Sequence, residues 1–285
     1  MLTAALELGG HHASTGLVGL TSPTVKLHDQ QRVAVDSRAP LSELLASLGH
    51  VCASLITPGR RWAIALPGPF DYVNGRGGRH TDGKYNAFNG VDLRALLTER
   101  WSASHISFCN DADAFGAGAW LYHGMPQRLF AMTLGTGIGS AFITDGRPTQ
   151  DADFPSELYC ETLADGRSLE DTFGPQSVVD RHNLHDPART VGSFRELAAL
   201  ARQDAAVGDA VATTMSGLAD AIAPWLLRFR PETVVFGGSV CRAWDVFGAG
   251  ITARIAAALG PDVPVRVMSD TETLSLVGAT SLGTA

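Results

Sequence analysis

The sequence predicts an α/β protein built from two related lobes. Its 285 residues are enough for two domains of ordinary size. Apolar strands alternate with helical segments, and the set of strand, glycine turn and return strand occurs twice, at 3–20 and 129–144. Each set is followed later by helix, strand and helix. We therefore expect two lobes with a cleft between them, where small ligands usually bind.

The composition excludes several classes of protein. Hydrophobic residues make up 45% of the chain and charged residues 18%, which argues against disorder. The net charge of -7 argues against a nucleic-acid partner, which would need a basic face. No apolar run approaches the roughly 18 residues that span a bilayer, and Glu7 stands where a signal peptide would be apolar. We expect a cytoplasmic enzyme without a membrane partner.

The cysteines indicate no redox or zinc motif. They stand at 52, 109, 160 and 241 and form no CxxC pair. Isolated cysteines in an enzyme are usually small buried apolar residues, and this pattern suits a reducing cytosol.

The first half of the chain reads as strands and helices in alternation. Leu41–Ile56 has leucines at helical spacing, and Trp62–Leu66 is a buried-type strand that stops at Pro67-Gly68-Pro69. A polar, glycine-rich loop is expected from Asp71 to Gly90. The other expected elements are the strands Thr3–Leu8, Ser14–Leu20, Gln31–Asp36 and Ile106–Cys109, and the helix Ala112–Leu121.

The second half begins with a hairpin and contains a long irregular stretch, from Asp145 to about Ser193. The expected elements are the strands Leu129–Leu134, Ser140–Thr144, Thr233–Phe236 and Val263–Val267, and the helices Phe194–Ala206, Ala210–Phe229, a helix to about Leu259, and Thr273–Leu282. We expect an N-terminal lobe of residues 1–122, completed by the C-terminal helix at 273–285, and a C-terminal lobe of residues 123–272.

Two glycine turns are candidates for phosphate binding, because consecutive backbone N–H groups without side chains in the way can cradle an anion. They are Glu7-Leu8-Gly9-Gly10 and the segment from Leu134 to Gly139, which reads Gly135-Thr136-Gly137 at its centre. Each is also what an ordinary β-hairpin needs. Neither matches a Walker loop or a dinucleotide fingerprint.

A third candidate is Asn110-Asp111-Ala112-Asp113, which follows a short strand and opens a helix. Helix capping explains these residue types, and so does a general base that accepts the proton of a sugar hydroxyl. The isolated Glu157 and Glu170 would normally be solvated. His11 and His12 are adjacent on a strand and point opposite ways, so we expect a surface pair.

The order of these pieces is more specific than any one of them, and it resembles the ROK family (repressors, open reading frames and kinases) within the actin-like sugar kinases. The matching motifs, in chain order, are Glu7 with Gly9 and Gly10, Ala65-Leu66-Pro67-Gly68-Pro69, Asn110-Asp111-Ala112, Gly135 to Gly139, Ser156-Glu157-Leu158, and Val234-Val235-Phe236-Gly237-Gly238. The resemblance covers nearly the whole chain. It implies two actin-like ATPase (ribonuclease H-like) lobes with a cleft between them and a sugar kinase.

The resemblance also implies a role for each motif. Asp111 is the catalytic base, and Glu7 helps to place Mg²⁺, directly or through water. The implied sugar contacts are Gly68, Asn86, Asn110, Asp111, Glu157 and Glu170. The implied ATP contacts are Gly9, Gly10, Thr136, Gly137, Gly237 and Gly238. We further expect a homodimer.

Three features depart from the family pattern. The opening acid is usually Asp, and Glu7 is one methylene longer. The threonine after the double glycine is His11 here. Many members carry a structural zinc held by one histidine and three cysteines, but Cys160 stands at the histidine's place and the cysteine cluster is missing. We expect no structural zinc.

Two other functions compete with a kinase. A repressor needs a helix-turn-helix segment before the first strand, and only two residues precede Thr3. A catalytically inactive sugar-binding protein is the other alternative, against which the retained Asp111 argues. The donor is expected to be ATP, although some relatives without the zinc cluster use polyphosphate.

The expected substrate has a modified ring. Tyr159 and Cys160 replace a glycine and a histidine of the family, and a thiol is a weaker hydrogen-bond partner than imidazole. We therefore expect phosphorylation of a primary hydroxyl, equivalent to position 6 of glucose, on an amino sugar such as kanosamine or on a C7 cyclitol of the valiolone type. Such substrates belong to relatives in antibiotic biosynthesis. Plain glucose, and so an ordinary glucokinase, is the alternative.

Overall fold

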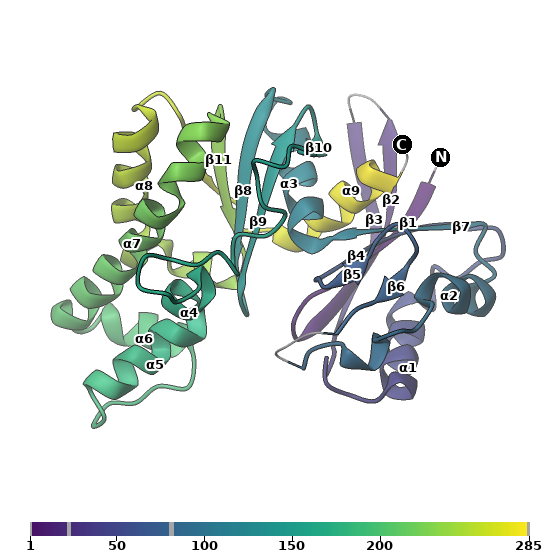
Figure 1. Cartoon of the computed structure of the whole chain (residues 1–285). Coiled ribbons are helices and arrows are strands. Elements are labelled where there is room, and N and C mark those ends of the chain that lie inside the picture. The colour runs from purple at the N-terminus through teal and green to yellow at the C-terminus, as the bar shows by residue number, and fades with distance from the viewer. Residues whose placement is uncertain (1, 22–23, 80–82, 284–285) are drawn as a thin grey trace. The chain divides into compact units, whose positions relative to one another are not determined.

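The computed structural model describes residues 2–21, 24–79 and 83–283, and the chain divides into two compact units (Figure 1). The first unit comprises residues 1–122 together with 272–285, and the second comprises 123–271. Residues 80–82 of the expected loop, and 284–285 of the expected C-terminal segment, lie outside the described residues.

The first unit is built on a five-stranded sheet in the order β3-β2-β1-β4-β7. Its strands are β1 (Leu2–Leu8), β2 (His12–Thr21), β3 (Thr24–Ala34), β4 (Arg61–Leu66) and β7 (His105–Asn110). The first three strands are antiparallel neighbours, whereas β1, β4 and β7 are parallel. Two short strands, β5 (Phe70–Asp71) and β6 (Arg76–Gly77), and the 3-10 helix η1 (Asn86–Phe88) follow β4.

The two faces of this sheet carry side chains of different size. Large residues such as Trp62 and Ile64 pack in one cluster with buried residues of α1 (Leu41–Cys52) and α2 (Leu93–Trp101). The alternate residues Ala63 and Ala65 face α3 (Asp111–Tyr122) and α9 (Thr271–Gly283). A strand sends successive side chains to opposite faces, so the alternation of large and small residues places two helices close to the sheet on the second face.

The second unit has a sheet in the order β10-β9-β8-β11-β12. Its strands are β8 (Arg128–Leu134), β9 (Ile138–Thr144), β10 (Arg147–Pro148), β11 (Thr233–Gly237) and β12 (Val265–Val267). Strands β8, β11 and β12 are parallel, and β9 is antiparallel to β8. The helices are α4 (Leu169–Phe173), α5 (Pro175–His185), α6 (Phe194–Ala201), α7 (Ala205–Phe229), η2 (Ser239–Ala243) and α8 (Trp244–Leu259).

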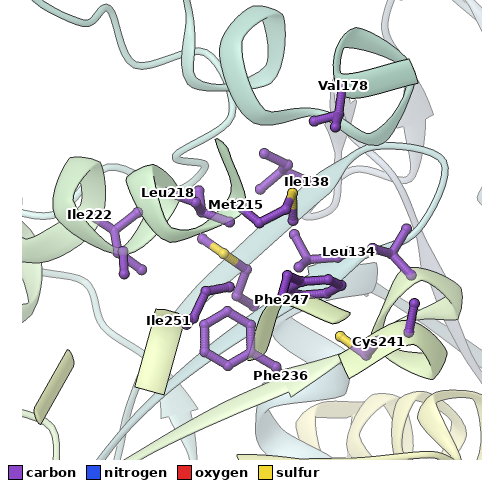
Figure 2. Packing of buried hydrophobic residues seen from close by; sticks show 14 of the residues in the cluster. Leu134, Ile138, Val178, Met215, Leu218, Ile222, Phe236, Cys241, Phe247 and Ile251 are labelled. Carbon is purple, nitrogen blue, oxygen red and sulfur yellow. The ribbon is translucent and has the colours of Figure 1, made fainter. Parts of the chain in front are cut away.

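The core of the second unit lies between its sheet and its helices (Figure 2). Leu134 and Phe236 from the sheet meet Met215 of α7 and Phe247 of α8, all fully buried. Among the described residues, α7 is the one helix whose length and composition would suit a membrane span. Its buried apolar residues belong to this core, so its apolar character is explained by packing within the unit.

The elements differ from those expected mainly in the irregular stretches. Helices α4 and α5 lie inside the stretch from Asp145 to Ser193, where a capping box between Ser168 and Asp171 starts α4. Helix α2 was not expected. The third strand is also earlier and longer than Gln31–Asp36, because an edge strand with exposed polar residues has little apolar alternation to reveal it.

Candidate active site

The parallel strands of the first unit bring three predicted motifs to one edge of its sheet. Glu7 lies beside Ala65, and Leu66 lies beside Asn110. The Gly9-Gly10 turn, the loop containing Gly68, and Asp111 each follow one of these strands directly. Ligands of open α/β sheets bind outside the carboxyl ends of the strands, so this edge is the candidate site of the first unit.

Asn110 is a helix cap, as its residue type allows. Its Oδ1 accepts hydrogen bonds from the backbone amides of Ala112, at 2.9 Å, and Asp113, at 3.2 Å. Its Nδ2 donates to the Tyr72 hydroxyl at 3.2 Å. Asp111 therefore begins α3, at the end of the helix where the dipole favours a carboxylate. Within this motif, Asn110 therefore caps the helix, and the adjacent Asp111 is the candidate base.

Two tyrosines complete this edge, and no local sequence pattern points to either. The Tyr72 hydroxyl donates to the Leu66 carbonyl at 3.2 Å. The buried Tyr85 hydroxyl donates to the Gly9 carbonyl at 2.5 Å. Burial, together with the charges of Glu7 and Asp111, raises the pKa of Tyr85. Tyr85 thus fixes the glycine turn, and the predicted sugar contact Asn86 follows it at the start of η1.

His12 is half-buried and faces Glu7, so the expectation of a surface pair is wrong for this residue, while His11 is exposed. Nε2 of His12 lies 3.3 Å from Oε2 of Glu7. The Glu7 carboxylate beside the ring raises the pKa of His12 against the opposing effect of burial. The position on the strand allowed either orientation, and only the packing decides which histidine points inward.

The surroundings of Oε2 of Glu7 do not fit a magnesium ion. Oε2 of Glu7 is closed to solvent, makes no well-formed hydrogen bond, and has the His12 imidazole nitrogen in front of it. Magnesium demands near-octahedral geometry at roughly 2.0–2.1 Å and usually keeps several waters. A hydrated ion would have to displace His12 to reach this oxygen.

The second unit brings a separate set of predicted residues together. Oε2 of Glu170 accepts a hydrogen bond from the Ile138 amide at 2.7 Å, and its carboxyl group lies against Gly137. Gly237 lies beside Thr133 in parallel register. Gly238 has a φ of 94° and packs on the backbone of the residue that ends β8, where a side chain would collide. Both glycine motifs therefore border the carboxyl ends of β8 and β11.

The segment around Glu157 is tied to the same turn region. The Leu158 amide donates to Ser140 Oγ at 2.9 Å, and the Glu170 amide donates to the Tyr159 carbonyl at 2.9 Å. Cys160 is exposed, and its Sγ donates to the Glu157 carbonyl at 3.4 Å. Within the described ranges, no three His, Cys, Asp or Glu side chains form a group that could hold a metal.

The predicted site residues thus fall into two groups, one in each unit. The first unit holds Glu7, Gly9, Gly10, Gly68, Asn86, Asn110 and Asp111. The second unit holds Thr136, Gly137, Glu157, Glu170, Gly237 and Gly238. Each group lies at or near the carboxyl edge of its own sheet.

The chain is similar to a known family in sequence and to many solved structures in fold. A family model described as the ROK family matches residues 3–153. The glucokinase of Streptomyces griseus, solved with glucose and AMPPNP, is 16% identical with a TM-score of 0.78, covering 100% of this chain and 99% of that chain. The inorganic polyphosphate/ATP-glucomannokinase of Arthrobacter sp. strain KM is 21% identical with a TM-score of 0.69, covering 99% and 98%.

A transcriptional regulator of the ROK family, a homologue of the E. coli MLC protein, is 16% identical with a TM-score of 0.76, covering 99% of this chain and 78% of that chain. None of the curated proteins matches the chain. At these identities the structural likeness establishes the fold. The predicted α/β class, with actin-like ATPase architecture, is confirmed.

Proposed function

Because the chain belongs to the ROK family, we propose that it is a sugar kinase, which transfers the terminal phosphoryl group of ATP to a hydroxyl of a hexose-like ring. The observation that carries the proposal is the position of Asp111. Its carboxylate starts α3 at the end of β7, at the same sheet edge as the loop containing Gly68. A carboxylate fixed there is suited to accept a proton from a bound hydroxyl.

In this reaction the substrate hydroxyl oxygen forms a bond to the γ-phosphorus of ATP. The bond from that phosphorus to the bridging oxygen breaks, ADP leaves, and the hydroxyl proton passes to Asp111. Phosphoryl transfer needs positioning and charge stabilisation more than covalent chemistry from the protein. Asn110 contributes by capping α3, because the cap holds the first turn of the helix in place.

The donor phosphates are assigned to the two glycine turns. Their backbone amides supply hydrogen-bond donors without side chains in the way. At the second turn, the Ile138 amide donates a hydrogen bond to the Glu170 carboxylate, which holds that end of the turn in place. ATP is the proposed donor. Polyphosphate is the alternative, supported by the structural likeness to the Arthrobacter enzyme, whose name includes both donors.

The proposed acceptor is the primary hydroxyl of an amino sugar such as kanosamine, or of a C7 cyclitol. The support is the exposed Cys160, which stands where the family has a histidine beside the sugar. Its thiol is a weaker hydrogen-bond partner than the imidazole of a histidine. It therefore favours a ring that depends less than glucose on a hydrogen bond at this position. Glucose remains the alternative acceptor, in an ordinary glucokinase.

A coupled assay tests the proposal. ADP release is measured with glucose, kanosamine and a C7 cyclitol under identical conditions, and sugar phosphate formation is measured with ATP and with polyphosphate. If glucose has a kcat/KM at least about tenfold higher than the others, roughly 1.4 kcal/mol in transition-state binding, the specialised acceptor is wrong. No turnover with any sugar and either donor would favour a catalytically inactive sugar-binding protein.

A further inference from the structure

Four ionisable side chains from four elements of the first unit meet beside the Gly9-Gly10 turn. His12, at the start of β2, has its Nε2 3.3 Å from Glu7 at the end of β1 and 3.6 Å from Glu272 on α9. Nε of Arg32 on β3 lies 3.1 Å from Glu272. Acidic and basic groups therefore alternate along the chain of contacts from Glu7 through His12 and Glu272 to Arg32.

The cluster is built around buried atoms. The Glu7 side chain is only 10% exposed, and the facing atoms of Glu7 and His12 are both closed to solvent. Neither atom makes a well-formed hydrogen bond to any other group. A buried carboxylate is costly unless a group of opposite charge or a hydrogen-bond donor accompanies it. Among the described residues, His12 is the group placed to do this for Glu7.

The His12 ring also lies on the glycine turn itself. A side chain carbon at Gly9 would collide with the imidazole, and the Gly9 amide donates to the His12 carbonyl at 2.9 Å. The ring and the backbone therefore close the turn from both sides. An imidazole displaced from Oε2 of Glu7 would leave the position in which it now covers Gly9.

We infer that Glu7 anchors His12 at the Gly9-Gly10 turn and is not a magnesium ligand in this protein. The inference explains one departure from the family pattern: the additional methylene of Glu7 extends its carboxylate toward the imidazole of His12, which occupies the space in front of it. Glu7 is thus a positioning residue, which acts on the turn through His12. The part of the inference that concerns magnesium rests on the proposed kinase function, whereas the anchoring does not.

The anchoring is tested by a double-mutant cycle in urea, without metal or nucleotide. The variants are Glu7→Gln, His12→Gln and both together. We expect the effects of the two substitutions on the unfolding equilibrium constant to be coupled by about fivefold or more, because the effects of substituting residues in contact do not add independently. The matched control pairs Glu7→Gln with His28→Gln, an exposed histidine on the same sheet, and should be additive within about twofold. Coupling below about twofold for Glu7 and His12 would overturn the anchoring.

The magnesium part is tested by nucleotide binding, which needs no turnover. AMPPNP affinity is measured with Mn²⁺ and with EDTA for the native protein, Glu7→Gln and His12→Gln, and Mn²⁺ is followed by electron paramagnetic resonance. We expect the ratio of the AMPPNP affinity with Mn²⁺ to that with EDTA to stay within about threefold of the native ratio in Glu7→Gln, because the ligands of the metal ion lie elsewhere. A larger loss of metal dependence in Glu7→Gln alone would overturn the inference. A native chain that binds no AMPPNP contradicts the ATP donor of the proposed function, and the urea cycle still decides the anchoring.

Discussion

The Glu170 carboxylate accepts a hydrogen bond from the backbone amide of Ile138 at 2.7 Å. This contact joins the first turn of α4 to the glycine turn between β8 and β9. A residue assigned to the sugar is thereby also a support of a turn assigned to the donor phosphates. Its two oxygens give it the capacity for both roles.

Replacement of Glu170 should separate the two roles. Glu170→Gln retains a carbonyl oxygen that can accept from Ile138, whereas Glu170→Ala leaves this amide without its partner. Because a hydrogen bond to a charged group contributes about 1.5–3 kcal/mol, we expect Glu170→Ala to lower kcat/KM for the donor by roughly 10- to 100-fold. Glu170→Gln should change kcat/KM for the donor by less than about fivefold, while it should lower the affinity for the sugar. Equal values of kcat/KM for the donor in the two variants would contradict the role of Glu170 in supporting the glycine turn.

Asp111→Asn keeps the shape of the side chain and removes its basicity. We expect turnover to fall by about 10²-fold or more, with sugar affinity changed far less. Asp113→Asn, in the same helical turn, is the matched control and should keep turnover within about threefold. Steady-state kinetics together with sugar binding by calorimetry make the measurement. Near-normal turnover of Asp111→Asn would remove this residue as the base.

Tyr85→Phe should destabilise the first unit and loosen the donor turn. The change leaves the Gly9 carbonyl without its buried donor, which costs about 1–3 kcal/mol in the free energy of unfolding. Urea unfolding measures the loss, and the KM for the donor should rise together with it. The control is Tyr122→Phe, because Tyr122 is 51% exposed. If both variants unfold at the same urea concentration, the bond to Gly9 is not stabilising.

The pairing of His12 with Glu7 should make stability depend on pH. The pKa of His12 is raised above its ordinary value of 6.5, chiefly by the Glu7 carboxylate beside the ring. The stabilisation is therefore fully present below about pH 6.5 and is lost as the pH rises through the folded-state pKa. Unfolding free energies from pH 6 to pH 9 should fall more steeply for the native protein than for His12→Gln. Parallel curves would show that the imidazole gains no proton on folding.

Two glycine replacements in helices should change stability in opposite directions. A side chain at Gly278 of α9 would collide with the Ala114 carbonyl of α3, so Gly278→Ala should destabilise by about 1–3 kcal/mol or more. Gly49 of α1 has no neighbouring atom within 4 Å of an added carbon. Gly49→Ala should therefore stabilise by about 0.5–1 kcal/mol. Thermal unfolding of both variants provides the comparison.

Local pattern was enough to predict the α/β class and two related units, and the resemblance of the motif order to the ROK family added the actin-like architecture. Strands such as Trp62–Leu66 are short, continuously apolar and bounded by proline and glycine, which leaves little choice of structure. The same holds for the glycine turns and for Asn110 at the start of a helix. These signals are local because steric and capping preferences act within a few residues.

Tertiary packing decided which side chains face the site. Tyr85 and Tyr72 come from a polar loop without periodicity, and they reach the site edge only because that loop folds back over the sheet. His12 also contacts Glu272, which is about 260 residues further along the chain and comes close only when α9 packs on the first unit. The sequence by itself determined the fold and the motif order, because these follow from short-range preferences. The contact of Glu170 with Ile138 and the contact of His12 with Glu272 depended on packing between distant segments, which no local pattern encodes.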